Sequence, residues 1–351
     1  MNSRSLDLAP MMAYLAAYRG RPLKIMEVCG THTATAFRGG IRGLLSPGIR
    51  LISGPGCPVC LAASAYIDRL CAYAHSGGHL VVSFGDLLKV KGADGSLLDA
   101  KARGGSVEMV YSPLDALKIA ASHPEKTVVL AAIGFETTAP AYALMLKTAI
   151  EAGIGNIRLL TALKRLIPAL EALCLTDGVD AFIAPGHVAA IIGSEVFRPV
   201  AAHFGKPFAV TGFTPEAMLT AIYLLAKRVE AGSSGVDNLY GEVVRPEGNL
   251  KALEVISEFF APGDTYWRGL SVIPDSGLYL REEYAGFDAG SMGLYDALAD
   301  QQGCRCSEVL TGRIEPGDCP LFGKTCTPEN AYGPCMVSAE GACGIWFHEG
   351  G

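Results

Sequence analysis

The chain has 351 residues, of which 50% are hydrophobic and 18% charged, and its formal net charge is -6 at pH 7. This length exceeds a single hydrophobic core, so we expect two or three domains, and the apolar content excludes a disordered chain. Lys and Arg are scattered along the sequence, which gives no reason to expect nucleic acid or an anionic membrane as a partner.

The amino-terminal segment, residues 1–22, contains an apolar patch but also Asp7 and Arg19. It lacks the long apolar run and small-residue cleavage site of a secretory signal, and no segment reaches 18 continuous apolar residues. We therefore expect a cytoplasmic protein with no membrane contact. Thiols stay reduced there, so the 11 cysteines are expected to be metal ligands, reactive thiols or buried side chains before they are disulfides.

Short apolar runs alternate with stretches of helical periodicity along the chain. The runs have the length and composition of buried strands and lie at residues 23–28, 50–52, 79–84, 107–111, 127–133, 157–160, 181–184 and 207–210. The helical stretches occupy residues 62–74, 113–121, 139–152, 163–173 and 215–230. This alternation predicts the α/β class, with two doubly wound, mainly parallel-sheet domains covered on both faces.

Two loop-like segments, 120–126 and 231–238, are candidate domain boundaries. They predict α/β domains at residues 21–125 and 126–238, and a third domain from residues 1–20 together with 239–351. From Gly303 onward the chain is dense in Cys, Gly and Pro. Such a segment cannot form much of a core alone and usually needs a metal or a cross-link.

The first motif with chemical content is IMEVCGTHT, in which a predicted strand ends and is followed by Cys29 and His32. In open α/β sheets, ligands bind in the crevice beyond the carboxyl ends of the strands. A thiolate with an imidazole three residues away could bind a metal or act as a nucleophile. A buried structural cysteine is the alternative.

The second motif, GPGCPVC, places Cys57 and Cys60 in a C-x-x-C spacing between a predicted strand and a predicted helix. This spacing permits a reversible disulfide and favours a lowered pKa for the attacking thiol. Half of a zinc knuckle is the alternative, although no second C-x-x-C completes it.

Two further strand ends carry polar residues. The segment VVLAAIGFETTAP delivers Glu136, Thr137 and Thr138, and DAFIAPGHV delivers His187. Because these residues follow wholly apolar strands, we expect them to face the crevice. The alternatives are a helix cap for Thr138 and an ordinary loop position for His187.

The carboxyl-terminal block contains six cysteines, Cys304, Cys306, Cys319, Cys326, Cys335 and Cys343. Four thiolates suit either an iron-sulfur cluster or tetrahedral zinc. The spacing forms no paired zinc knuckles, which favours iron-sulfur, while zinc or disulfides stay open. The remaining cysteines, Cys71 and Cys174, lie in helical apolar segments and are interpreted as core residues.

Together the motifs MEVCGTHT, ISGPGCPVC, SFGDLLKV, VYSPLDALKIA, GFETTAP, APGHV, WRGLSVIPDSG and the terminal cysteine block resemble the HypD family of hydrogenase maturation proteins over residues 22–347. The resemblance implies two doubly wound α/β domains related by pseudo-symmetry. It also implies a third domain with a 4Fe-4S cluster in surroundings similar to those of ferredoxin:thioredoxin reductase. Ser307 and Ser271 stand where the family usually has Gly, which affects only local turns.

The resemblance also implies roles for single residues. The cluster ligands would be Cys304, Cys319, Cys326 and Cys343, which leaves Cys306 and Cys335 as an extra pair. Cys29 would transiently hold iron jointly with the amino-terminal cysteine of the partner HypC, with His32 beside it. Glu136, Thr138 and His187 would surround the iron.

In such a protein the iron unit Fe(CN)2CO is assembled and passed to the large subunit of a nickel-iron hydrogenase. HypE, with HypF upstream, would deliver cyanide from a thiocyanate on its own terminal cysteine, while Cys57 and Cys60 exchange electrons with the cluster. The chain would then be an assembly scaffold with thiol redox and ligand-transfer chemistry, not an enzyme that turns over a free metabolite.

Two other functions remain open from the sequence. A 4Fe-4S-dependent protein disulfide reductase, similar to ferredoxin:thioredoxin reductase, would need Cys57, Cys60 and the cluster but not Cys29. A zinc-stabilised metabolic enzyme would contain zinc without iron.

Overall fold

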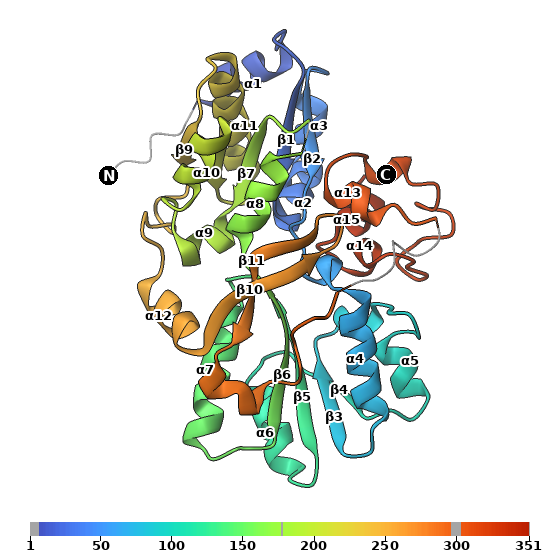
Figure 1. Ribbon diagram of the computed structural model, residues 1–351. Coiled ribbons are helices and arrows are strands. Elements are labelled where there is room, and N and C mark those ends of the chain that lie inside the picture. Colours follow the sequence, from blue (N-terminus) through green and yellow to red (C-terminus); the bar gives the residue numbers. More distant parts are fainter. Residues whose placement is uncertain (1–6, 177, 296–302, 351) are drawn as a thin grey trace.

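The computed structural model describes residues 7–176, 178–295 and 303–350. Residues 1–6 and 296–302, which belong to the third expected domain, lie outside the described residues. The strands form two sheets, and sheet A occupies the upper half of Figure 1 and sheet B the lower half.

Sheet A contains five parallel strands. Their spatial order is β2 (Ile49–Ser53), β1 (Leu23–Glu27), β7 (Ala181–Pro185), β8 (Pro207–Thr211) and β9 (Gly235–Asn238). One face packs against α1 (Leu8–Ala16), α2 (Gly30–Arg38), α3 (Ile41–Leu44) and α11 (Pro215–Glu230). The other face packs against α8 (Leu166–Cys174), α9 (Gly186–Ile192) and α10 (Phe197–Phe204).

Sheet B contains six strands in the order β10 (Phe260–Trp267), β11 (Ser271–Leu280), β6 (Ile157–Lys164), β5 (Thr127–Gly134), β3 (His79–Ser83) and β4 (Val107–Met109). The last four are parallel, and the β10-β11 hairpin joins them antiparallel to β6. One face of sheet B is covered by α4 (Ser64–His75) and α5 (Leu97–Ala102). The other face is covered by α6 (Asp115–Ser122), α7 (Ala139–Glu151) and α12 (Leu250–Phe259).

Helices therefore cover both faces of both sheets, as the expected α/β class requires. In β5 every residue after Thr127 is buried, which explains why its sequence is a continuous apolar run without alternation. The prediction of two mainly parallel, doubly wound sheets is confirmed.

The expected boundaries near residues 125 and 238 do not separate the two sheets. The chain builds β1 and β2 of sheet A, leaves to form β3 to β6 of sheet B, and returns with β7 to β9. The third expected domain is likewise divided, because α1 packs on α11 while β10 and β11 extend sheet B. Loop composition marks surface turns, but pairing between strands distant in sequence decides which sheet a strand joins.

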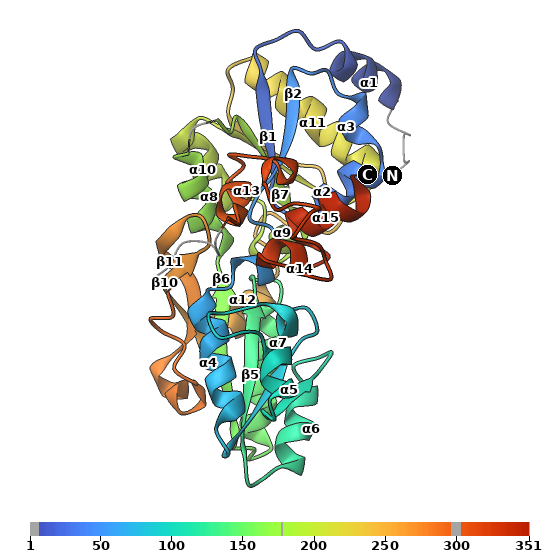
Figure 2. The ribbon, with the colours of Figure 1, turned by 90° about the vertical axis from the view of Figure 1, so that its right-hand side faces the viewer.

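The cysteine-rich carboxyl-terminal segment lies at the junction between the two sheets (Figure 2). It contains α13 (Cys306–Leu310), α14 (Pro334–Val337) and α15 (Ala342–Glu349), together with the short turn η4 (Pro316–Asp318). Side chains such as Val309 and Met336 join the same apolar cluster as Met26 and Ile52 of sheet A. The segment therefore packs on the apolar core of sheet A. Three further short turns are η1 (Val59–Leu61), η2 (Leu87–Lys89) and η3 (Glu282–Phe287).

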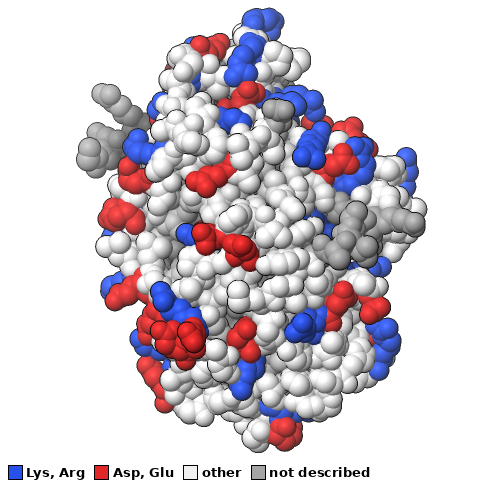
Figure 3. Space-filling view, viewed as in Figure 1, with Lys and Arg blue, Asp and Glu red and all other residues white. Residues whose placement is uncertain are grey.

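The surface carries charges of both signs. On the face drawn in Figure 3, Lys and Arg are interspersed with Asp and Glu and form no continuous basic area. Within the described part of the chain, no helix has both the length and the apolar character needed to cross a membrane.

Candidate functional site

A crevice of about 220 Å³ lies where the carboxyl ends of the parallel strands of both sheets meet. Sheet A contributes the residues that follow β1, β2 and β7, and sheet B contributes the turn after β5. The carboxyl-terminal segment supplies one wall. The residues that line the crevice include Cys29, Gly56, Pro58, Phe135, Thr138, Leu166, His187 and Glu340. Both sheets thus place their ligand-binding ends on one cavity.

Cys29 is the only thiol of the described residues that lines this crevice. It is the N-cap residue of α2, with extended backbone geometry, and is 9% exposed. Burial raises the pKa of the Cys29 thiol, while the hydroxyl and N–H of Thr31 and the N–H of His32 act in the opposite direction. A bound metal cation would favour the thiolate in this place.

Two glycines make the close packing around Cys29 possible. A Cβ atom on Gly30 would lie 2.2 Å from the carbonyl oxygen of Glu340, so the carboxyl-terminal segment touches the start of α2. A Cβ atom on Gly56 would lie 2.4 Å from the Cα atom of Cys29, so the C-x-x-C turn lies directly against it. The three motifs meet only because these positions have no side chain.

His32 does not line the crevice but lies behind it, with its ring stacked on Phe213 at 4.7 Å between centroids. The ring of Phe213 also stacks on His187, at 4.0 Å between centroids. The Nε2–H of His32 donates to the carbonyl oxygen of Gly212 at 3.0 Å, and its Nδ1 has no hydrogen-bond partner among the described residues. Burial lowers the pKa of His32 to about 4, so the imidazole is neutral at pH 7.

Thr138 and His187 both line the crevice. Thr138 occupies the N-cap position of α7 but makes no cap hydrogen bond, and its hydroxyl donates to the carbonyl oxygen of Phe135 at 3.2 Å. His187 lies in the first turn of α9, at the end of β7. Both residues are therefore available on the wall of the cavity that contains Cys29.

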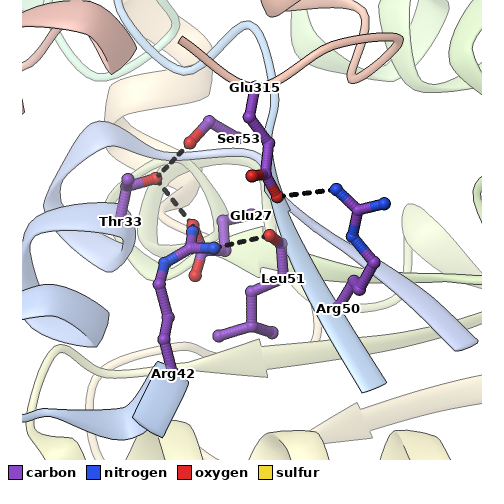
Figure 4. A network of polar contacts seen from close by, with 7 residues as sticks. All are labelled: Glu27, Thr33, Arg42, Arg50, Leu51, Ser53 and Glu315. Carbon is purple, nitrogen blue, oxygen red and sulfur yellow. Dashed lines mark hydrogen bonds and ion pairs between the residues drawn. The ribbon is translucent and has the colours of Figure 1, made fainter. Parts of the chain in front are cut away.

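A buried polar network underlies the loop that carries Cys29 (Figure 4). Glu27 on β1 is fully buried, and its carboxylate accepts from the hydroxyl of Thr33 at 2.8 Å and from Arg42 at 3.1 Å. Arg42 also donates to the carbonyl oxygen of Leu51 at 2.6 Å, and its guanidinium lies 5.3 Å from the ring centroid of Trp346. The network ties β1, α2, α3 and α15 together around the site.

Cys57 and Cys60 lie behind the crevice, and both are buried. The N–H of Cys60 donates to the sulfur of Cys57 at 3.3 Å, and the Cys60 thiol faces the carbonyl oxygen of Pro334 at 3.7 Å. The C-x-x-C spacing favours a lowered pKa for the attacking thiol, and Cys60 does not have this property. Complete burial in an apolar cluster raises the pKa of its thiol well above the ordinary value.

The thiols of the carboxyl-terminal segment form a chain of contacts with this pair. Cys335 interacts with Cys60, Cys306 and Cys343, and Cys306 interacts with Cys304. Burial is the main cause that raises the pKa of Cys335. For Cys306 the contact with Cys304 lowers the pKa, but the contact with Cys335 and burial together raise it above the ordinary value.

Of the four cysteines expected as cluster ligands, three are electrostatic neighbours. Cys304 and Cys343 both lie close enough to Cys326 to raise its pKa, after burial as the main cause. Cys319 is partly exposed and lies near Arg305. Soft, convergent thiols suit an iron-sulfur cluster in their chemistry. As placed, however, no three or more His, Cys, Asp or Glu side chains of residues 7–176, 178–295 and 303–350 form a group that could hold a metal ion.

Of the residues predicted from strand ends, the structure brings Cys29, Thr138 and His187 to one crevice. Glu136 is not on its lining; it contributes to a different cavity. Sequence reasoning missed Glu340, which lines the crevice and whose carboxylate acts to raise the pKa of Cys29. It also missed Phe213, although this residue follows β8 and the strand-end pattern used for the others could have found it.

Comparison with known proteins agrees with these motifs. A family model described as "HypD: Hydrogenase formation hypA family" matches residues 8–350. The chain is 43% identical to the hydrogenase maturation factor HypD of Escherichia coli (strain K12), over 95% of this chain and 91% of that protein. It is 41% identical to HypD of Rhizobium leguminosarum bv. viciae (97% and 91%) and 38% identical to HypD of Azotobacter vinelandii (94% and 90%). The chain therefore belongs to the HypD family of hydrogenase maturation factors.

Proposed function

We propose that the chain is the scaffold on which the Fe(CN)2CO unit of nickel-iron hydrogenases is assembled, with Cys29 as the protein ligand of the iron. The observation that carries this proposal is the convergence of Cys29, His187 and Glu340 on one small crevice at the strand ends of both sheets. A soft thiolate suits low-spin iron, and an imidazole and a carboxylate can balance charge or hydrogen-bond to its ligands.

The dimensions and the walls of the crevice suit an iron atom that carries small diatomic ligands. The cavity of about 220 Å³ has apolar walls from Val28, Phe135 and Leu166, which exclude water from the thiol. Neutral His32 contributes indirectly, because it stacks on Phe213, and Phe213 in turn holds the ring of His187.

Partner proteins are part of this proposal. The amino-terminal cysteine of HypC would share the iron with Cys29. HypE, supplied by HypF, would present the thiocyanate, and the hydrogenase large subunit would finally receive the unit. Release of cyanide from a thiocyanate needs two electrons and leaves a thiolate, and oxidation of the Cys57–Cys60 dithiol to a disulfide yields two electrons and two protons. The contact between Gly56 and Cys29 puts this dithiol next to the iron ligand.

Cys304, Cys319, Cys326 and Cys343 would hold a 4Fe-4S cluster. When bound, such a cluster supplies single electrons that can return a disulfide to a dithiol. The contacts that link Cys60 through Cys335 to Cys306 support this use, since they connect the C-x-x-C pair with the carboxyl-terminal thiols.

The test compares Cys29→Ala with a control variant, Cys71→Ala. Cys71 lies on α4 in the core of sheet B. Each variant is co-produced anaerobically with HypC, HypE and HypF, and the purified protein is examined by infrared spectroscopy for bound cyanide and carbon monoxide. We expect Cys29→Ala to lose both bands while its iron and sulfide content stays at the wild-type level. Wild-type bands in Cys29→Ala would overturn the proposal.

The thiol contacts favour one second candidate, a cluster-dependent protein disulfide reductase. The series of contacting thiols that leads from Cys57 to Cys306 does not include Cys29. Reduction of a protein disulfide by the cluster-loaded protein, unchanged in Cys29→Ala and accompanied by no infrared bands in the wild type, would favour that function.

A further inference from the structure

A second and larger cavity, of about 670 Å³, lies between α8, α9, α12 and the β10-β11 hairpin. In Figure 1 these elements meet on the side of the molecule away from the cysteine-rich segment. Most of its lining is aliphatic or aromatic, with a buried floor that includes Ile192, Ile256, Phe260 and Leu278. Its size and composition are those of small-molecule sites in proteins.

Glu136 supplies the polar end of this cavity and is 6% exposed. Its Oε1 accepts from the N–H of Leu166 at 2.8 Å, but its Oε2 is buried and has no hydrogen-bond partner among the described residues. Arg165 also lines the cavity, but its guanidinium donates to the carbonyl oxygen of Asp275 at 2.7 Å, and no hydrogen bond from it reaches Oε2 of Glu136. One acceptor atom at the cavity therefore lacks a donor.

An unpaired acceptor of this kind is unfavourable in a buried site, because it has lost its hydrogen bond to water and gained none in return. Since no described residue supplies a donor to this atom, a molecule in the cavity can supply one. We propose that this cavity binds a small, largely apolar molecule with one hydrogen-bond donor, such as an alcohol, whose donor pairs with Oε2 of Glu136 and whose apolar body lies along α12.

This site is distinct from the Cys29 crevice but shares the turn after β5 with it. Phe135, Thr137 and Thr138 line the crevice, whereas Glu136 between them lines the second cavity. The inference does not depend on the proposed maturation function, because it uses no thiol and no metal.

The test uses naphthalenemethanol and its methyl ether, in which a methyl group replaces the hydroxyl hydrogen and removes the hydrogen-bond donor. Binding to the full-length protein is measured by titration calorimetry at pH 9, at which the carboxyl group of Glu136 is ionised. We expect the alcohol to bind at least about tenfold more tightly than the ether, since the ether leaves Oε2 unpaired. In Glu136→Gln the amide oxygen keeps the bond from Leu166 and the NH2 group replaces the acceptor. The preference for the alcohol is then expected to disappear, because the oxygen of either probe can accept a hydrogen bond from the NH2 group.

Two further variants locate the binding. Leu253→Trp, on the cavity side of α12, fills the space and should abolish binding of both probes, whereas Leu144→Trp, exposed on α7, should leave both affinities unchanged. Absence of alcohol binding to the wild type would overturn the proposal. Equal affinities of the wild type for the two probes would also overturn the proposal, because Oε2 would then receive no hydrogen bond from the alcohol. An unchanged preference for the alcohol in Glu136→Gln would overturn it as well, because the preference would then not depend on Oε2.

Discussion

Replacement of Arg42 by Met would remove the cation that faces the fully buried carboxylate of Glu27. The two side chains are 3.1 Å apart, with 20% of the Arg42 side chain and none of the Glu27 side chain exposed. The second carboxylate oxygen of Glu27 has no hydrogen-bond partner within the described ranges. The Arg42→Met variant would therefore keep a buried carboxylate with only the hydroxyl of Thr33 to stabilise it.

The expected magnitude follows from this geometry. Removal of one partner of a buried ion pair costs about 3 to 5 kcal/mol, and the partial exposure of Arg42 puts the expected loss near the lower limit, about 3 kcal/mol at pH 8. In the double variant Glu27→Gln/Arg42→Met no charge is left buried. The loss should fall to about 1 kcal/mol, which represents the lost bond to Leu51 and the contact with Trp346.

The pH dependence gives a further check. Burial raises the pKa of Glu27 above its ordinary value of 4.5, and Arg42 opposes this effect. A raised folded-state pKa means that the favourable contribution is complete below the unfolded-state value and is lost as the pH rises through the folded-state value. Without Arg42 the pKa rises further, so the deficit of Arg42→Met should be smallest near pH 4.5 and grow with pH.

Denaturant unfolding followed by circular dichroism at pH 5 and pH 8 measures these differences. The matched control is Arg50→Met, which removes the more exposed pair with Glu315 that is drawn in Figure 4. That loss should be below about 1 kcal/mol and independent of pH. The reasoning is refuted if Arg42→Met shows the same deficit at both pH values and Glu27→Gln restores nothing.

Two further predictions concern single residues near the two cavities. Burial raises the pKa of Glu136 from 4.5 to about 7, so its contribution to stability is complete below pH 4.5 and is lost as the pH rises through 7. The difference in unfolding free energy between Glu136→Gln and the wild type should therefore change by about 3 kcal/mol in favour of the variant from pH 4.5 to pH 8, as measured by denaturant titration. A difference that stays constant with pH would show that burial of Glu136 is not the cause. Gly30→Ala should displace Glu340 and raise amide hydrogen exchange in α15, whereas Gly43→Ala, whose Cβ meets nothing within 4 Å, should not.

Local patterns predicted most of the strands but not three of them. The runs at 127–133 and 181–184 correspond to β5 and β7, because a strand buried on both faces must be apolar throughout. Strands β9, β10 and β11 were not expected. Pro262 and Gly263 interrupt β10, and its pairing with β11 contains a register shift near Gly263, so no continuous apolar run marks the hairpin.

The candidate site was predictable where it depends on strand ends and not where it depends on long-range contacts. Cys29 and His187 follow adjacent strands of sheet A, so the rule for parallel sheets places them together. Glu136 follows β5 in the same way, but one residue of offset in the turn directs it to another cavity. Glu340 reaches the crevice because Gly30 and Gly341 permit close backbone contacts, which sequence spacing does not reveal.

The interleaving of the two sheets has a consequence for synthesis on the ribosome. Ile25 of β1 pairs with Ala181 of β7, so the first strands must wait for their neighbour while the intervening chain is translated, roughly 10 to 30 s at typical elongation rates. During that interval sheet A is incomplete, so it does not yet bury the apolar edge of β1 or the thiols at positions 29, 57 and 60. The nascent chain is therefore expected to depend on chaperones and on reducing conditions until the second half has emerged.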